Sequence, residues 1–139
     1  MFRNILIPTD FSKNYIRPLE IALNLAEKYK SAIHLLHVVE VIADTEFADY
    51  EGFYSKLENR AKKKMSALIA SYSGKEVPII PAIVYGNRVQ EILKFIKENR
   101  IDLVIMNSHK LDRRDPIQSW GTISYKVALF SDCPIMLAK

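Results

Sequence analysis

Short runs of apolar residues, rich in β-branched side chains, recur along this chain and alternate with segments of helical periodicity. Five of these runs are predicted strands, and they lie at Asn4–Pro8, Ala32–Val39, Pro78–Val84, Asp102–Asn107 and Cys133–Ala138. Their near-continuous apolarity is typical of strands that are covered on both faces, as in a parallel sheet.

The segments between the strands place apolar residues three or four positions apart, which predicts one core-facing stripe on each of four helices. The stripes comprise Tyr15, Leu19, Ala22, Leu23, Ala26 and Tyr29; Tyr50, Tyr54, Leu57, Ala61, Met65, Leu68 and Tyr72; Val89, Ile92, Leu93 and Ile96; and Ile123, Val127 and Phe130. The stretch Glu40–Phe53 is ambiguous, since its composition suits a loop, a frayed helix start or a lid that binds a partner.

This alternation predicts a single α/β domain over residues 1–139, with a doubly wound sheet and right-handed crossovers. In such a sheet a ligand binds beyond the carboxyl ends of the strands, where the strand order reverses. If the first and fourth strands are neighbours there, two distant segments meet, Pro8–Ser12 and Met106–Val127. The candidate site is therefore formed by these two segments.

In the first of these segments, Asp10 directly follows a predicted strand. Its carboxylate is suited to accept hydrogen bonds from a ligand amine or hydroxyl. An equally good interpretation is structural, because Asp is common in turns and Ser12 is a natural cap for the helix that follows. Both interpretations stay open at this point.

The second segment contains one glycine, Gly121, which with Thr122 begins the last predicted helix. Unpaired N–H groups and the helix dipole make a helix start a potential anion site, and Thr122 and Ser124 add hydroxyl donors. The simpler alternative is that Thr122 only caps the helix.

Composition and charge limit the kinds of protein and partner that this sequence suggests. The chain has 49% apolar and 26% charged residues and a net charge of +4 that is spread along its length. The densest basic run, Arg60–Met65, is interpreted as a solvated helix face, so no nucleic-acid partner is expected. No run is long enough for a membrane span, no signal peptide is recognisable, and Cys133 is the only cysteine, so we expect a cytoplasmic protein without membrane contact.

Other candidate chemistry is weak. Ser108 and His109 are adjacent on an extended strand end and point apart, and no third orienting group is evident, so no catalytic residues and no enzyme are predicted. His34 and His37 are three apart in a strand and face opposite sides, so no metal site is predicted either.

The chain resembles the universal stress proteins in four stretches: NILIPTDFS (Asn4–Ser12), LLHVVE (Leu35–Glu40), VYGNRVQEIL (Val84–Leu93) and CPIMLAK (Cys133–Lys139). The resemblance implies an adenine nucleotide alpha hydrolase-like fold, (βα)4β with strand order 3-2-1-4-5, and a homodimer formed through the C-terminal strand. ATP-binding members carry G-x2-G-x9-G-[ST] after the fourth strand. By this resemblance the adenosine end of a site consists of Pro8, Thr9, Asp10, Val38 and Met106. The phosphate end consists of Asn107, Ser108, His109, Lys110, Gly121, Thr122 and Ser124.

This sequence departs from that motif. Asn107 and Lys110 replace the first two glycines, and ten residues instead of nine separate Lys110 from Gly121. If the position of Lys110 requires a positive φ, the cost is about 1–2 kcal/mol. Since about 1.4 kcal/mol is tenfold in affinity and Arg113 and Arg114 add cations to the loop, we predict altered or weakened adenine-nucleotide binding. The ligand would be ATP with Mg²⁺, or AMP, with no nucleotide as the remaining alternative.

Three functional hypotheses follow. The first is a homodimeric, nucleotide-responsive module of the stress response that acts on an unidentified protein partner. The second is a nucleotide-free interaction dimer with Trp120 as an anchor, and the third and least favoured is a slow ATP hydrolase. For the dimer we predict contacts from Ile135 and Leu137, or from the alternate pair Met136 and Ala138, because an edge strand invites pairing.

Overall fold

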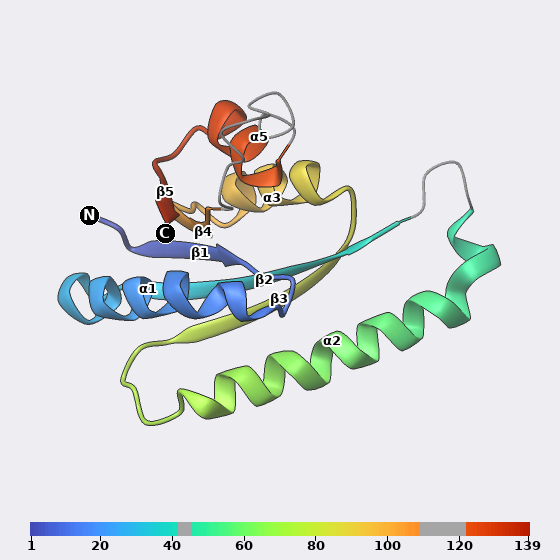
Figure 1. Cartoon of the computed structure of the whole chain (residues 1–139), viewed down its shortest axis with the longest axis horizontal. Coiled ribbons are helices and arrows are strands. Elements are labelled where there is room, and N and C mark those ends of the chain that lie inside the picture. The colour runs from blue at the N-terminus through green and yellow to red at the C-terminus, as the bar shows by residue number, and fades with distance from the viewer. Residues whose placement is uncertain (42–45, 109–121) are drawn as a thin grey trace.

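A computed structural model of the chain describes residues 1–41, 46–108 and 122–139 (Figure 1). Its strands are β1 (Asn4–Pro8), β2 (Ala32–Glu40), β3 (Ile79–Gly86), β4 (Leu103–Asn107) and β5 (Ile135–Ala138). Its α-helices are α1 (Ile16–Tyr29), α2 (Glu51–Ser71), α3 (Arg88–Glu98) and α5 (Ile123–Phe130), and two 3₁₀ turns, η1 (Lys13–Tyr15) and η2 (Phe47–Tyr50), precede α1 and α2.

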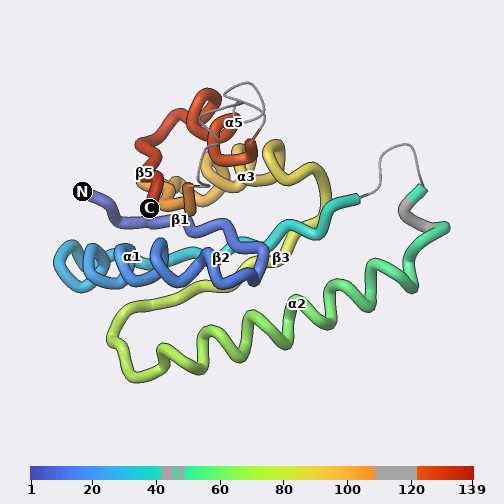
Figure 2. Tube along the Cα trace, in the orientation of Figure 1, coloured from blue at the N-terminus to red at the C-terminus, as the bar shows by residue number. Residues whose placement is uncertain are grey.

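The five strands form one parallel sheet in the order β3-β2-β1-β4-β5, which confirms the predicted fold class and strand order. The order reverses between β1 and β4, so the carboxyl ends of these two strands flank the switch point. Helices α1 and α2 cover one face of the sheet, and α3 and α5 cover the other (Figure 1; the trace is in Figure 2).

Alternation along the central strand shows why its sequence is apolar at every position. Ile5 and Ile7 belong to the cluster that contains the buried residues of α1 and α2, whereas Leu6 between them packs with α3 and α5. All three are completely buried. A strand covered on both faces therefore needs apolar residues without interruption, as the sequence pattern indicated.

The strand and helix predictions are confirmed with small shifts of their ends. β2 continues one residue further than predicted, to Glu40, and β3 continues to Gly86. Pro81 lies inside β3 without breaking it, because β3 is an edge strand and a proline there forfeits no essential ladder bond. Of the ambiguous stretch Glu40–Phe53, residues 42–45 lie outside the described residues, and the rest supplies the end of β2, η2 and the start of α2.

The prediction of burial is wrong for three residues of the core stripes. Tyr29, Tyr50 and Phe130 are 37%, 41% and 67% exposed, although each continues the spacing of a buried stripe. Tyr29 and Phe130 are the last residues of their helices and Tyr50 precedes the first residue of α2, so each lies at a helix end that the core does not cover. Periodicity specifies the side of a helix that faces the core, and it does not specify where the sheet beneath it ends.

Among the described residues, no helix is both long and apolar enough to cross a membrane.

Candidate functional site

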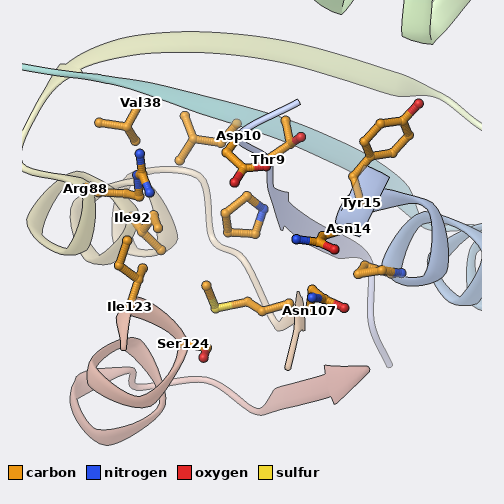
Figure 3. A pocket seen from close by; sticks show the side chains of 14 residues that line it. Thr9, Asp10, Asn14, Tyr15, Val38, Arg88, Ile92, Asn107, Ile123 and Ser124 are labelled. Carbon is orange, nitrogen blue, oxygen red and sulfur yellow. The ribbon is translucent and has the colours of Figure 1, made fainter. Parts of the chain in front are cut away.

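A pocket opens at the carboxyl ends of the strands, at the predicted switch point (Figure 3). Its described lining consists of Pro8, Thr9, Asp10, Asn14, Tyr15, Pro18, Leu36, Val38, Arg88, Ile92, Met106, Asn107, Ile123 and Ser124. These residues come from the ends of β1, β2 and β4 and from the starts of η1 with α1, α3 and α5. The lining combines aliphatic side chains with a small number of polar and charged groups, which is the usual composition of a small-molecule site.

Side chains hold the turn after β1 in shape. The Thr9 hydroxyl accepts a hydrogen bond from the Phe11 N–H at 3.0 Å, and Asp10 Oδ1 accepts one from the Ser12 N–H at 2.8 Å. Phe11 adopts a left-handed φ of 63°, which is costly for a residue other than glycine and is stabilised here by the two flanking bonds. Ser12 occupies the N-cap position of η1 as predicted, but its side chain makes no capping hydrogen bond.

Asp10 therefore serves the turn and also faces the pocket, so the two interpretations of this residue are compatible. Partial burial alone would raise the pKa of its carboxyl. Hydrogen bonds from Ser12 and the nearby charge of Arg88 outweigh that effect, and the pKa of Asp10 is lowered below its usual value. Asp10 is thus an anion at neutral pH, and it can only accept hydrogen bonds.

The turn is supported from behind by His37, on the face of β2 opposite the pocket floor. Its Nδ1 lies 2.9 Å from the Thr9 carbonyl oxygen, so Nδ1 carries the proton and donates a hydrogen bond to that oxygen. The imidazole also packs on the Phe11 ring, with 4.5 Å between the ring centroids. Burial lowers the pKa of His37, with smaller effects from the charges of Arg88 and Lys64 in the same direction.

His34 lies on the other face of β2, as predicted for two histidines three positions apart. Its Nε2 is 3.2 Å from Asn4 Oδ1, and its ring meets Phe95 of α3 edge-on. In the described ranges no three His, Cys, Asp or Glu side chains come together as a set of metal ligands.

The pocket brings together all five residues that the resemblance assigned to the adenosine end, namely Pro8, Thr9, Asp10, Val38 and Met106. From the assigned phosphate end, Asn107 and Ser124 also line it. Ser108 and Thr122 stand outside the described lining, while His109, Lys110 and Gly121 lie outside the described residues.

Two of the phosphate-end residues have structural roles. The Ser108 N–H donates to the Ala138 carbonyl at 2.8 Å and extends the pairing of β4 with β5. The Thr122 hydroxyl accepts a hydrogen bond from the Tyr125 N–H at 3.3 Å, so Thr122 caps α5. The predicted cap is therefore present, and the anion site at this helix start stays a prediction.

Sequence reasoning missed seven lining residues: Asn14, Tyr15, Pro18, Leu36, Arg88, Ile92 and Ile123. Arg88 is the most informative of them, because it and Asp10 are the charged residues of the described lining. The Asn87 side chain caps α3 by accepting from the Gln90 N–H at 3.1 Å, and this places Arg88 in the first turn. A strand followed by Gly86 and the cap Asn87 is a signal that would have placed Arg88 at the same end of the sheet as Asp10.

The model of the universal stress protein family matches residues 1–139. Similar relatives include the universal stress protein YxiE of Bacillus subtilis, which is 24% identical over 149 residues and matches along 100% of both chains. Another is the universal stress protein MJ0577 of Methanocaldococcus jannaschii, which is 28% identical over 160 residues, covering 100% of this chain and 96% of the relative.

Several solved structures share the fold. The universal stress protein UspA from Lactobacillus plantarum superposes with a TM-score of 0.81 at 21% identity, covering 99% of this chain and 98% of that one. A universal stress protein from Archaeoglobus fulgidus in complex with dAMP gives 0.71 at 16% identity over 100% of both chains. A universal stress protein in complex with cAMP gives 0.66 at 15% identity, covering 99% and 96%.

Proposed function

This chain belongs to the universal stress protein family, and from that premise we propose that it is a cytoplasmic regulatory module whose pocket binds an adenine nucleotide. Binding would alter the contacts of the protein with a partner by favouring one of two states of the pocket rim. The module is proposed to be a binding protein and not an enzyme.

One observation carries the proposal: the five residues assigned to the adenosine end, Pro8, Thr9, Asp10, Val38 and Met106, line a single pocket. Two structures of the same fold contain dAMP and cAMP, which are small adenine nucleotides. Val38 and Met106 are 5% and 7% exposed and provide an apolar surface for a base, while the Asp10 carboxylate is suited to a ligand hydroxyl or amine.

The residues assigned to the phosphate end of the pocket support altered binding of an adenine nucleotide. Asn107 places an amide side chain in the pocket where the resemblance implies a glycine in ATP-binding members, so a phosphate would approach the backbone there less closely. Ser124, which is 8% exposed at the start of α5, lines the pocket, and its hydroxyl lies 3.4 Å from that of Thr122. We therefore propose that binding is weaker or differently arranged than in relatives with the complete glycine motif.

Calorimetric titration of the purified protein with adenosine, AMP, cAMP, ADP and ATP, with and without Mg²⁺, tests this function. We expect micromolar to submillimolar binding of at least one adenine nucleotide, and a higher melting temperature at saturating ligand. If none of the five compounds produces heat or changes the melting temperature, the proposal is wrong.

A homodimer is also proposed, through the outer edge of β5. This strand pairs with β4 on one side and ends the sheet on the other, so one row of its backbone groups is available for a second copy. Met136 and Leu137 of β5 are 36% and 42% exposed, and Leu129 and Phe130 at the end of α5 are 60% and 67% exposed. Each alternate pair of the sequence hypothesis contains one of these exposed residues, Leu137 or Met136, whereas Ala138 is buried, and the interface stays a prediction.

The same apolar surface favours the second candidate, a nucleotide-free interaction dimer. If the titrations show no ligand, the exposed side chains of α5 and β5 remain as the functional surface. Trp120, the anchor suggested by the sequence, lies outside the described residues.

A further inference from the structure

His37 contacts the turn after β1 from the face of the sheet opposite the pocket. Leu36 and Val38, its neighbours along β2, line the pocket, whereas His37 between them stands outside the described lining. Successive side chains of a strand point to opposite faces, so the imidazole lies on the face that α1 and α2 cover. Its influence on a ligand would therefore pass through the turn.

The turn is tied to β2 at both polar groups of the Thr9 backbone. The Thr9 N–H donates to the Leu36 carbonyl at 2.8 Å, and the Thr9 carbonyl oxygen accepts a hydrogen bond from His37 Nδ1 at 2.9 Å. That carbonyl belongs to the same planar peptide group as the Asp10 N–H. His37 therefore fixes the peptide group from which Asp10 extends, and it helps to set the direction of the carboxylate that faces the pocket.

The imidazole also supports the residue that follows Asp10. Phe11 has a left-handed φ of 63°, a conformation that persists in a residue other than glycine only where the surroundings hold it. Its ring centroid lies 4.5 Å from that of the His37 imidazole, and Lys64 Nζ of α2 lies 5.9 Å from the Phe11 ring centroid. Displacement of the imidazole would therefore loosen the turn on both sides of Asp10.

The surroundings of the imidazole favour its neutral form. Burial lowers the pKa of His37, and the charges of Arg88 and Lys64 act in the same direction. The hydrogen bond to Thr9 and the charge of Asp10 oppose this change without cancelling it. An imidazole turned out to solvent would keep its ordinary pKa of about 6.5. By linkage, acid therefore favours the conformation in which the imidazole leaves the turn.

We propose that His37 is a positioning residue for the pocket: its neutral imidazole holds the Thr9–Asp10 peptide group in the ligand-binding shape, and its protonation weakens nucleotide binding. The proposal rests on the proposed function, because it takes the pocket to be a nucleotide site. It requires no contact between His37 and the ligand. Affinity should be constant above the ordinary pKa of histidine, and it should fall as the pH drops from about 6.5 towards the lower folded value.

Three variants separate this role from the general stability of the fold, with AMP titrated calorimetrically at about pH 7.5, where His37 is neutral. His37→Phe keeps a ring beside Phe11 and removes the donor, so AMP affinity should fall about fivefold, the effect of one lost hydrogen bond. His37→Asn places an amide donor near the position of Nδ1 and should restore most of that affinity. His34→Asn is the matched control, because His34 lies in the same strand but bonds to Asn4, away from the pocket, and it should leave AMP affinity unchanged.

The effect of protonation is measured with adenosine, which has no phosphate to titrate in this range. From about pH 7.5 to about pH 5.5 its affinity for the unmodified protein should fall about threefold or more, while Asp10, whose pKa is lowered, stays ionised. His37→Asn should abolish this fall, and His34→Asn should retain it, although burial lowers the pKa of His34 as well. In the protein without ligand, the amide NMR signals of Phe11 and Ser12 should shift with the midpoint of the His37 ring.

The outcomes separate this inference from the function on which it rests. Unchanged AMP affinity in His37→Phe, or a loss that His37→Asn does not restore, overturns the positioning role while nucleotide binding stands. An adenosine affinity that is independent of pH, or that keeps its pH dependence in His37→Asn, overturns the effect of protonation. If neither AMP nor adenosine binds the unmodified protein, the proposed function is wrong. The NMR titration then decides alone, and turn signals that do not follow the His37 ring overturn its hold on the turn.

Discussion

Asp10 has two roles in the structure, and a pair of substitutions separates them. Its Oδ1 atom accepts the Ser12 N–H at 2.8 Å and so closes the turn after β1, while the carboxylate also faces the pocket. Asp10→Asn retains an oxygen that can close the turn and removes the charge. Asp10→Ala removes both the turn bond and the acceptor for a ligand.

The stability changes follow from the turn bond. Loss of a side-chain acceptor for a backbone N–H at such a site typically costs about 1 kcal/mol. For a domain of this size that corresponds to a melting temperature lower by roughly 4 °C. We expect this decrease for Asp10→Ala and a change of only a few tenths of a kcal/mol for Asp10→Asn, measured by urea and thermal unfolding without ligand.

Ligand affinity should follow a different order. A hydrogen bond to a charged acceptor is worth about 1.5–3 kcal/mol, so Asp10→Ala should weaken AMP binding roughly tenfold or more. Asp10→Asn keeps a neutral acceptor and should weaken it roughly fivefold. Asp10→Asn with unchanged stability and reduced affinity would identify the carboxylate as a ligand contact.

The effect of pH on stability gives an independent check on the turn. Hydrogen bonds from Ser12 and the charge of Arg88 outweigh burial and lower the pKa of Asp10 in the folded protein. Its stabilising contribution is therefore complete above its ordinary pKa of about 3.9 and is lost as the pH falls through the lower folded value.

Unaltered AMP affinity in both Asp10 variants would refute the ligand contact, and unaltered stability of Asp10→Ala would refute the role in the turn.

Three further predictions concern the rest of the molecule. Gly86→Ala should lower the free energy of unfolding by about 1–2 kcal/mol, because Gly86 has a φ of 147° that side chains rarely adopt. Gly74→Ala, where an added Cβ meets open space, is the control and should stay within about 0.5 kcal/mol in the same urea titration. Burial lowers the pKa of His37, so protonation favours the unfolded chain and stability should fall as the pH drops below about 7, through the unfolded value of about 6.5 towards the folded one. His37→Gln should flatten that decline between pH 7 and 5, and an unchanged slope would contradict the buried neutral histidine. Phe130→Asp should convert the proposed dimer to monomers in light scattering while the fold remains intact by circular dichroism, and a persistent dimer would place the interface elsewhere.

The sequence was sufficient for the sheet because its central strands are apolar at every position. Ile5, Leu6 and Ile7 pack against helices on both faces, and so many short apolar runs that alternate with helical segments indicate a parallel sheet covered on both faces. The sequence was not sufficient to predict which residues are exposed at the edges of the sheet. Phe130 continues a helical stripe and is exposed, because periodicity does not specify which strand is the last in the sheet.

The candidate site was predicted in part for a similar reason. Asp10 follows a strand directly, so topology alone places it at the switch point. Arg88 follows an edge strand and reaches the same pocket from the first turn of α3. Its position depends on the length of β3 and on the cap that Asn87 forms. Strand ends are the least certain feature of a sequence pattern, and a shift of two residues in β3 decides whether the position of Arg88 is recognised.

The two ends of the candidate site come from different parts of the chain, so the proposed nucleotide binding does not depend on the glycine motif alone. Val38 and Met106 belong to β2 and β4, and parallel pairing in the sheet places them independently of the glycine motif that begins at Asn107. Asn107 and Lys110 stand where the resemblance places glycines, and glycine is the residue that lets a phosphate approach the backbone closely. Their cost should therefore grow with the number of phosphates, whereas the apolar floor and Asp10 keep their contribution.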